Sequence, residues 1–319
     1  MISKKYTCNA PKREVFQVFS ETMRELIEND SDVVYIDADL MSSLKSKDLW
    51  KEYPKNVINT GIQEANMIGV AAGMYLYGKK PYVHSFAPFA TRRCFDQIYI
   101  SIGYAQKGIR IIGSDPGICA TGNGGTHMTF EDIALLRAIP GSVIFDISDS
   151  IMFEKVLRLT KDSNGVNYIR VPRRGLPDIY SEDENFEIGK AKKIHEGTDC
   201  TVIASEIMLQ TAIEASEILL KKGIKIDLID PITIKPLDQD TIISSAKVTG
   251  KVVTVENHSI FGGLGGAVAE LLSEKFPVKI KRMGINEQYG QVGNELYLRQ
   301  QYSLTVEDLV ATIETIMEV

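Results

Sequence analysis

The sequence predicts an α/β protein made of two doubly wound domains, the first at residues 1–178 and the second at residues 190–319, joined by a linker at 179–189. Short apolar runs of strand length alternate with longer runs of helical periodicity. Strands that are separated by helices build a mostly parallel sheet with helices on both faces. A polar, acidic stretch with Gly and Pro interrupts this alternation and divides the two domains.

The elements of the first domain follow from this alternation. A helical period of apolar residues, which ends at Ile27, precedes a short apolar strand at residues 32–36. A helix predicted at residues 129–137 has Thr129 as its cap. Three further buried strands are predicted, at residues 110–113, 142–145 and 166–171.

The second domain repeats the pattern. Strands are predicted at residues 200–204, 224–230 and 251–256. A helix is expected at residues 208–221, and the glycine run Gly262–Gly266 opens another. This run is similar to a phosphate cradle, but it lacks the Lys-Ser/Thr ending of a P-loop and a suitably placed acidic ribose ligand. We interpret it as a point of close strand-to-helix packing, because glycine lets backbones approach.

Composition excludes several classes of protein. The 319 residues are 44% hydrophobic and 24% charged, which are values of a soluble globular protein. The net charge of −6 makes a nucleic-acid partner unexpected. No apolar run reaches the length of a membrane span, and the first residues lack a signal-peptide pattern. The four cysteines, which lie far apart, predict reduced thiols in a cytoplasmic protein and give no metal signature.

A single carboxylate, Glu64, stands at the start of an otherwise uncharged helix. The helix carries small residues at Ala65, Gly69, Ala72 and Gly73, a face that another helix can approach closely. An acid beside such an apolar face is unfavourable unless it has a partner or keeps its proton. Glu64 is therefore either a proton donor toward a ring nitrogen of a ligand or an ordinary first-turn acid that the helix dipole stabilises.

Two further segments indicate what kind of site the segment around Glu64 belongs to. Phe86 and Phe89 follow a strand, and the segment 113–117 leads into the glycine turn 124–127, Gly-Gly-Thr-His. With these three blocks together, the chain resembles the pyrimidine-binding domain of thiamine-diphosphate enzymes, and most closely the C-terminal half of transketolase. The resemblance covers nearly the whole chain, and it implies a transketolase C-terminal-like domain after the linker.

The resemblance implies thiamine diphosphate as cofactor. This cofactor can lose its thiazolium proton only when its 4′-amino group is in the imino form, which an acid at the pyrimidine N1′ favours. Glu64 matches the residue with that role. Phe86 and Phe89 match the aromatic pocket for the pyrimidine ring, although two core aromatics would give the same pattern. The third aromatic position of the family falls on Arg92.

Two more residues match positions near the reacting atoms. His127 is expected to pass protons to the substrate carbonyl or to hold a hydroxyl of the substrate, and the alternative is a structural histidine. Asp39 resembles the residue that lines the thiazolium region, and the alternative is a polar cap after a strand.

The substrate end departs from the family. Transketolases hold the sugar phosphate with two arginines, a serine and a histidine, of which Arg13, Arg173 and Ser43 match three. Guanidinium groups suit a tetrahedral oxyanion. The histidine position falls on Asp115, an acid that would repel a phosphate, and the aspartate that holds a substrate hydroxyl falls on Asn123. These changes predict an unusual substrate and leave the cofactor chemistry intact.

A motif that full-length transketolases use is absent. Their Gly-Asp-Gly, with a later Asn, holds the divalent metal and the diphosphate, and this sequence contains no Gly-Asp-Gly. We therefore expect one half of a split enzyme, inactive alone and without metal ligands of its own. An N-terminal transketolase subunit would supply the diphosphate site and the ligands of Mg²⁺ or Ca²⁺. Two chains of each kind would form a heterotetramer.

The predicted reaction is transfer of a two-carbon ketol unit from a ketose, with a phosphate or another anionic end, to an aldose. The β subunit of a 2-oxoacid dehydrogenase is an alternative, since it has similar length and domain order. The turn at 124–127, with Arg13 and Arg173, favours transketolase. A deoxyxylulose-phosphate synthase is disfavoured because that protein is a single long chain. A non-catalytic remnant would need a damaged cofactor pocket, whereas the acid and both aromatics are present.

Overall fold

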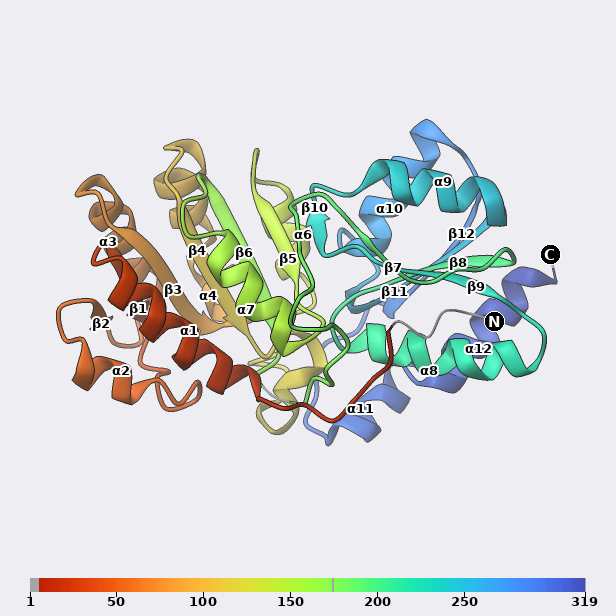
Figure 1. The fold of residues 1–319 in the computed structure, drawn as a ribbon, viewed down its shortest axis with the longest axis horizontal. Coiled ribbons are helices and arrows are strands. Elements are labelled where there is room, and N and C mark those ends of the chain that lie inside the picture. The colour runs from red at the N-terminus through yellow and green to blue at the C-terminus, as the bar shows by residue number, and fades with distance from the viewer. Residues whose placement is uncertain (1–5, 174, 319) are drawn as a thin grey trace.

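The computed structural model describes residues 6–173 and 175–318. Two sheets lie side by side, each with helices on both faces, so the predicted fold class of two α/β domains is confirmed (Figure 1). The exact domain and linker boundaries stay predictions.

The first sheet has the strand order β10-β5-β6-β4-β3-β1-β2 and is parallel except for the antiparallel pair β10–β5. Its strands are β1 (Val33–Asp37), β2 (Val57–Asn59), β3 (Lys80–Phe86), β4 (Ile109–Ser114), β5 (Val143–Asp146), β6 (Val166–Val171) and β10 (Thr233–Lys235). Because β10 comes from the second half of the chain, that half completes the first sheet. The sequence pattern predicted neither this strand nor β2.

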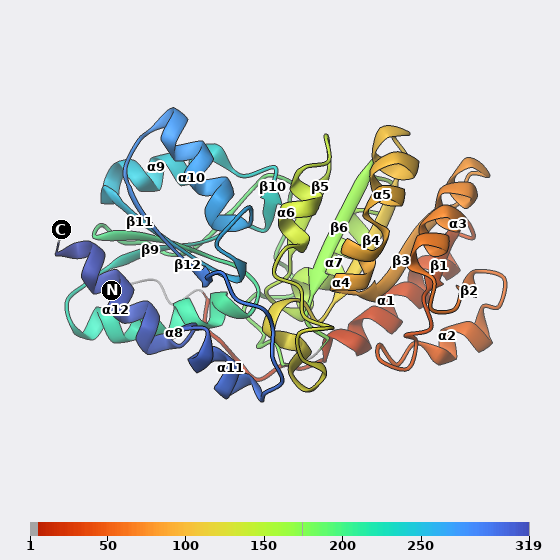
Figure 2. The ribbon, with the colours of Figure 1, turned by 180° about the vertical axis from the view of Figure 1, so that it is seen from behind.

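The helices of the first half form two layers. Helices α1 (Val15–Asn29) and α7 (Ser150–Leu159) pack together on the face toward the viewer in Figure 1. Figure 2 shows the opposite face, which carries α3 (Glu64–Leu76), α4 (Ala87–Ala90), α5 (Phe95–Gln97) and α6 (Asp132–Arg137). The remaining helical segments are α2 (Lys47–Glu52), η1 (Arg92–Cys94), η2 (Ile98–Tyr104) and η3 (Gly117–Asn123).

Strand periodicity explains why both faces are covered. Val33 and Tyr35 of β1 pack into the core that includes α1 and α7, whereas Val34 and Ile36 pack into the core that includes α3. Successive side chains of a strand point to opposite faces, so a strand buried on both sides reads as a continuous apolar run.

The second sheet has the order β12-β11-β8-β9-β7, with only β7–β9 antiparallel. Its strands are β7 (Lys192–His195), β8 (Cys200–Ala204), β9 (Ile226–Asp230), β11 (Lys251–Ser259) and β12 (Lys279–Ile285). Its helices are α8 (Ile207–Lys221), α9 (Gln239–Thr249), α10 (Leu264–Lys275), α11 (Glu295–Gln301) and α12 (Val306–Met317).

Two local predictions have clear outcomes. The glycine run is a point of close packing, as predicted: a Cβ on Gly263 would come within 2.0 Å of the Glu256 carboxylate, which accepts hydrogen bonds from the N–H groups of Leu264 and Gly265. The predicted cap Thr129 is wrong, because α6 starts only at Asp132 and its N-cap residue is Glu131.

Candidate active site

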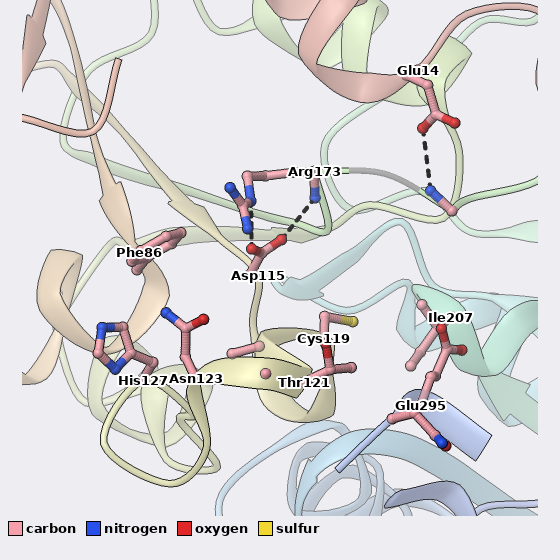
Figure 3. Close-up of a pocket in the computed structure, with 14 residues that line it drawn as sticks. Glu14, Phe86, Asp115, Cys119, Thr121, Asn123, His127, Arg173, Ile207 and Glu295 are labelled. Carbon is pink, nitrogen blue, oxygen red and sulfur yellow. Dashed lines mark hydrogen bonds and ion pairs between the residues drawn. The ribbon is translucent and has the colours of Figure 1, made fainter. Parts of the chain in front are cut away.

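A cavity of about 530 Å³ lies at the carboxyl ends of the strands of the first sheet. Phe86 ends β3, Asp115 follows β4, and Arg173 follows β6. Ligands of open α/β sheets bind in this position, outside the carboxyl ends of the strands. Figure 3 shows the cavity, which is lined by Glu14, Phe86, Asp115, Cys119, Ala120, Thr121, Gly122, Asn123, His127, Arg173, Gly175, Ile207, Asn294 and Glu295.

Glu64 occupies the first turn of α3, as predicted, and its side chain is buried. It is not an acid without partners, however. The Ser85 hydroxyl donates a 2.8 Å hydrogen bond to Oε1, and Arg93 Nη1 donates one of 2.8 Å to Oε2. Glu64 therefore has the partner that an acid beside an apolar helix face needs, because the end of β3 and η1 bring a hydroxyl and a guanidinium to it.

The aromatic residues that the motifs singled out form one cluster. The Phe86 and Phe89 rings lie 6.3 Å apart. The ring of His127 meets both edge-on, at 5.9 Å from Phe86 and 5.1 Å from Phe89. Thr126 contacts the histidine Nδ1 through a hydrogen bond of 2.9 Å. The glycine turn therefore places an imidazole against the aromatic pair at the mouth of the cavity.

Arg93 joins this cluster to Glu64. Its guanidinium lies 3.8 Å from the centroid of the Phe89 ring while Nη1 contacts the Glu64 carboxylate. The Arg93 guanidinium thus lies over the Phe89 ring and donates a hydrogen bond to Glu64 at the same time. A pyrimidine ring needs the same two contacts, a flat apolar face and an acid at a ring nitrogen, so these residues fit that ring.

A second arginine, Arg173, lines the cavity itself. The Asp115 carboxylate accepts a hydrogen bond from the Arg173 backbone N–H at 3.1 Å and a short one from its Nε. Arg173 Nη1 also donates to the Ser43 carbonyl oxygen at 3.4 Å, and the guanidinium lies 5.0 Å from the Phe86 ring centroid. The hydroxyl of Ser43 instead donates to the Leu40 carbonyl.

Six of the predicted residues are not among those that line the cavity. Glu64 and Phe89 contact Arg93, and Ser43 meets Arg173 through its carbonyl oxygen. The other three have partners elsewhere. Arg13 pairs with Glu21 at 3.0 Å and Glu154 at 2.6 Å. Arg92 pairs with Glu131 at 2.7 Å. Asp39 accepts a hydrogen bond from the Asn59 side chain at 3.0 Å and adopts a left-handed φ of 65°. Each side chain is held by partners outside the residues that line the cavity.

Several residues that line the cavity were not predicted from the sequence. Glu14 faces the cavity in place of Arg13, and its carboxylate accepts a 3.2 Å hydrogen bond from the Gly175 N–H. Three lining residues come from the second half of the chain, at least 80 residues in sequence after the glycine turn that ends at His127: Ile207, Asn294 and Glu295. Figure 3 shows Phe86, Asn123 and His127 on one side of the cavity and Ile207 and Glu295 on the other. No local pattern marks these additional residues.

A buried polar network supports the wall of the cavity. The Cys119 thiol donates to Glu206 Oε1 at 3.3 Å, and the Asn257 side chain contacts the same oxygen. The pKa of Glu206 is raised to about 8. Burial is the largest cause and Asp146 adds to it, while the nearby Arg170 acts in the opposite direction. The carboxyl group therefore links both halves of the chain directly behind the cavity.

Other features are absent from residues 6–173 and 175–318. That part of the chain holds no group of three or more His, Cys, Asp or Glu side chains arranged to bind a metal ion. None of its helices is both long enough and apolar enough to cross a membrane.

Comparison with protein families decides the classification. The model described as transketolase, pyrimidine binding domain, matches residues 12–178, and the model described as transketolase, C-terminal domain, matches residues 189–309. The chain belongs to the transketolase family. The family depends on thiamine diphosphate.

Relatives of similar length are subunits of split transketolases. The chain is 40% identical over 300 residues to the 6-deoxy-6-sulfo-D-fructose transketolase subunit of Clostridium sp. (strain MSTE9), covering 94% of this chain and 93% of the relative. It is 36% identical to one subunit of the apulose-4-phosphate transketolase of Phocaeicola vulgatus, covering 92% of this chain and 94% of that relative. The transketolase is thus of the split form, and a 2-oxoacid dehydrogenase β subunit is not favoured.

Solved structures agree. A split-gene transketolase, described as an inactive β4 tetramer, has a TM-score of 0.86 and 35% identity, with coverage of 96% of this chain and 98% of that one. A transketolase of Campylobacter jejuni, at 19% identity and a TM-score of 0.79, shares the fold and is covered over 47% of its length.

Proposed function

We propose that this transketolase subunit binds the pyrimidine half of thiamine diphosphate and, with a partner subunit, transfers a two-carbon ketol unit from an anionic ketose to an aldose. One observation carries the proposal. Arg93 lies over the Phe89 ring and donates a hydrogen bond to Glu64, which is the pair of contacts that a pyrimidine ring would make. When bound, thiamine diphosphate supplies the nucleophilic carbon of the reaction.

The residues of this chain have distinct roles in the proposal. Glu64 donates a hydrogen bond to the N1′ atom of the cofactor, and Phe86 and Phe89 form the apolar wall for the ring. His127 lies against both rings and lines the cavity, so it is placed to exchange a proton with a substrate oxygen or to hold a hydroxyl. We assign Arg92 and Asp39 no cofactor contact, because their partners hold them elsewhere.

The substrate would occupy the cavity beside this wall. Asn123 and Arg173 line it, and the Ser43 carbonyl fixes the guanidinium. The relative from Clostridium is named for a sulfonated ketose and the one from Phocaeicola for a sugar phosphate. Both names describe anionic sugars, which supports an anionic end for the substrate of this chain. Arg13 has no role in substrate binding here, because Glu21 and Glu154 hold its guanidinium.

The open face of α3 supports assembly with a partner. A Cβ on Gly69 or on Gly73 would meet no atom within 4 Å. Ile62 and Tyr77, at the two ends of the helix, are 72% and 89% exposed. Ala72 of the predicted close-packing face is buried in the core, so what lies open is the side of α3 that carries Gly69 and Gly73. We infer that it packs against another subunit, in a complex of two chains of each kind.

The partner that we propose is an N-terminal transketolase subunit. It would hold the diphosphate and the Mg²⁺ or Ca²⁺ ion, since the family uses a Gly-Asp-Gly motif for this and the sequence contains none. Four free cysteines are consistent with a reducing compartment, which supports the cytoplasm as location.

Reconstitution tests the proposal. The purified chain and the product of a neighbouring gene that encodes a Gly-Asp-Gly subunit are assayed separately and together for ketol transfer. We expect transfer only in the mixture with thiamine diphosphate and Mg²⁺, and no tight cofactor binding by this chain alone in calorimetry. Micromolar binding by the isolated chain, or no transfer to any aldose by the mixture, would overturn it.

A further inference from the structure

The charge of the cavity is unusual for a site that would hold a phosphate. Among the described residues that line it, three carry carboxylates, Glu14, Asp115 and Glu295, and one carries a permanent positive charge, Arg173. Glu295 pairs with Arg299 at 2.9 Å, outside the lining, so its charge is compensated there. Glu14 is held by a backbone N–H of Gly175. The cavity therefore has no surplus of described cations.

Asp115 occupies part of the hydrogen-bonding capacity of Arg173 and compensates its charge. One Asp115 oxygen accepts a hydrogen bond from the Arg173 backbone N–H and the other accepts one from Arg173 Nε. The carboxylate therefore fixes both the backbone and the side chain of Arg173. Asp115 holds this contact with a φ of 49°, a left-handed conformation that a non-glycine residue adopts at a cost and that concentrates at functional sites. Its side chain is only 7% exposed, so solvent screens its charge little.

Charge decides which terminal anion such a pair accepts. A phosphate monoester carries about −1.5 to −2 charges at pH 7, because its second pKa is about 6. A sulfonate has the same tetrahedral set of three acceptor oxygens but a single charge. Arg173 attracts either group, whereas the Asp115 carboxylate repels the second charge of a phosphate more strongly than the single charge of a sulfonate.

We propose that Asp115 is a specificity-determining residue, which makes this cavity select ketoses with a singly charged tetrahedral end over ketoses with a phosphate end. The inference rests on the proposed function, since it assigns the cavity to the far end of the ketose. It assigns no part of the ketol transfer itself to Asp115.

The test compares two ketohexose donors that differ only at C6, one with a 6-sulfonate and one with a 6-phosphate, on the reconstituted enzyme. The measured quantity is the ratio of their kcat/KM values at pH 7.5 and at pH 5.5. Enzyme groups that titrate in this range affect both donors, so the ratio reports mainly the charge of the phosphate. We expect the wild type to prefer the sulfonate by about tenfold at pH 7.5, which is about 1.4 kcal/mol. This preference should shrink at pH 5.5, where most of the phosphate carries one proton and a single negative charge.

Asp115→Asn removes the charge and keeps the size of the side chain. The variant should lose most of the preference at pH 7.5, while Asp48→Asn, on an exposed turn of α2 and paired with Lys51, should keep it. A wild-type ratio that is independent of pH, or an equal ratio in wild type and Asp115→Asn, would overturn the inference. The pH series uses the wild type alone, so the test survives a variant that fails to fold. Absence of transfer from both donors would instead contradict the proposed function.

Discussion

Replacing Glu64 with Gln separates the two interpretations of this acid. The glutamine side chain keeps the shape of glutamate and an oxygen that can accept a hydrogen bond from Ser85. It can neither carry the negative charge that pairs with Arg93 nor supply an acidic proton to the cofactor. Loss of a positioned acid lowers a rate by about 10²–10⁴-fold. If Glu64 were only a first-turn acid, its removal would instead cost about 0.3–1 kcal/mol of helix-dipole energy and leave the rate unchanged.

The structure bounds the effect on stability. The lost ion pair joins a buried carboxylate to a guanidinium whose side chain is 43% exposed, so solvent screens it and the pair contributes about 1 kcal/mol or less. That corresponds to a fall in Tm of about 2–4 °C for a domain of this size. We therefore expect a small change in stability beside a large change in rate.

The assay is steady-state ketol transfer by the reconstituted enzyme, with thermal unfolding and size-exclusion chromatography of each variant. Ser85→Ala is the matched control, because it removes a hydrogen bond to the same carboxylate but leaves the acid in place. Its rate should fall far less than that of Glu64→Gln. A Glu64→Gln enzyme that assembles normally and turns over within twofold of the wild type would refute the reasoning.

Three further predictions follow from the contacts of single residues. Arg93→Ala should tighten thiamine diphosphate binding by the assembled enzyme several-fold in calorimetry, because it uncovers Phe89 and Glu64; weaker binding would make Arg93 part of the loaded site. Gly69→Leu should leave the circular dichroism unchanged but prevent assembly in sedimentation experiments, since its side chain meets open space; normal assembly would remove α3 from the interface. Glu206, whose pKa burial raises to about 8, stabilises the fold fully below its ordinary pKa of 4.5, and this stabilisation is lost as pH rises through about 8. The Tm of Glu206→Gln should therefore fall less than that of the wild type between pH 5 and pH 9, and parallel curves would contradict this.

Periodicity predicted the strands well because burial on both faces leaves a clear apolar signal. Strands β6 and β8 occur at the predicted residues, 166–171 and 200–204. Four strands were not predicted: β2, β7, β10 and β12. Strand β10 is only three residues long and depends on pairing with β5, which lies some 90 residues earlier. The start of α6 was misplaced because Thr129 is a common capping residue, although here its side chain caps no helix.

The site was predicted as far as its residues carry local motifs. The cluster of Phe86, Phe89 and His127 follows from two blocks that each stand at the end of a strand. Arg13 was assigned to the substrate on its position alone, and nothing in the local sequence shows that Glu154, far along the chain, holds its guanidinium. Arg93 was overlooked in favour of its neighbour Arg92, because a resemblance that aligns positions does not say which of two adjacent arginines turns toward the acid.

A set of an acid, an arginine and a phenylalanine occurs twice. Asp115, Arg173 and Phe86 line the cavity, whereas Glu64, Arg93 and Phe89 are not among the residues that line it. Arg93 lies on Phe89 and bonds to Glu64 through its side chain alone, and its side chain is 43% exposed. Arg173 lies near Phe86, is 24% exposed and is clamped through its backbone N–H, its Nε and the Ser43 carbonyl. An arginine held by one side-chain contact next to solvent is easily displaced by a ring that offers the same contact, whereas an arginine held from three sides keeps its place. Within the proposed function, we therefore infer that the cofactor takes over the position of Arg93 and that Arg173 is a fixed contact for the substrate.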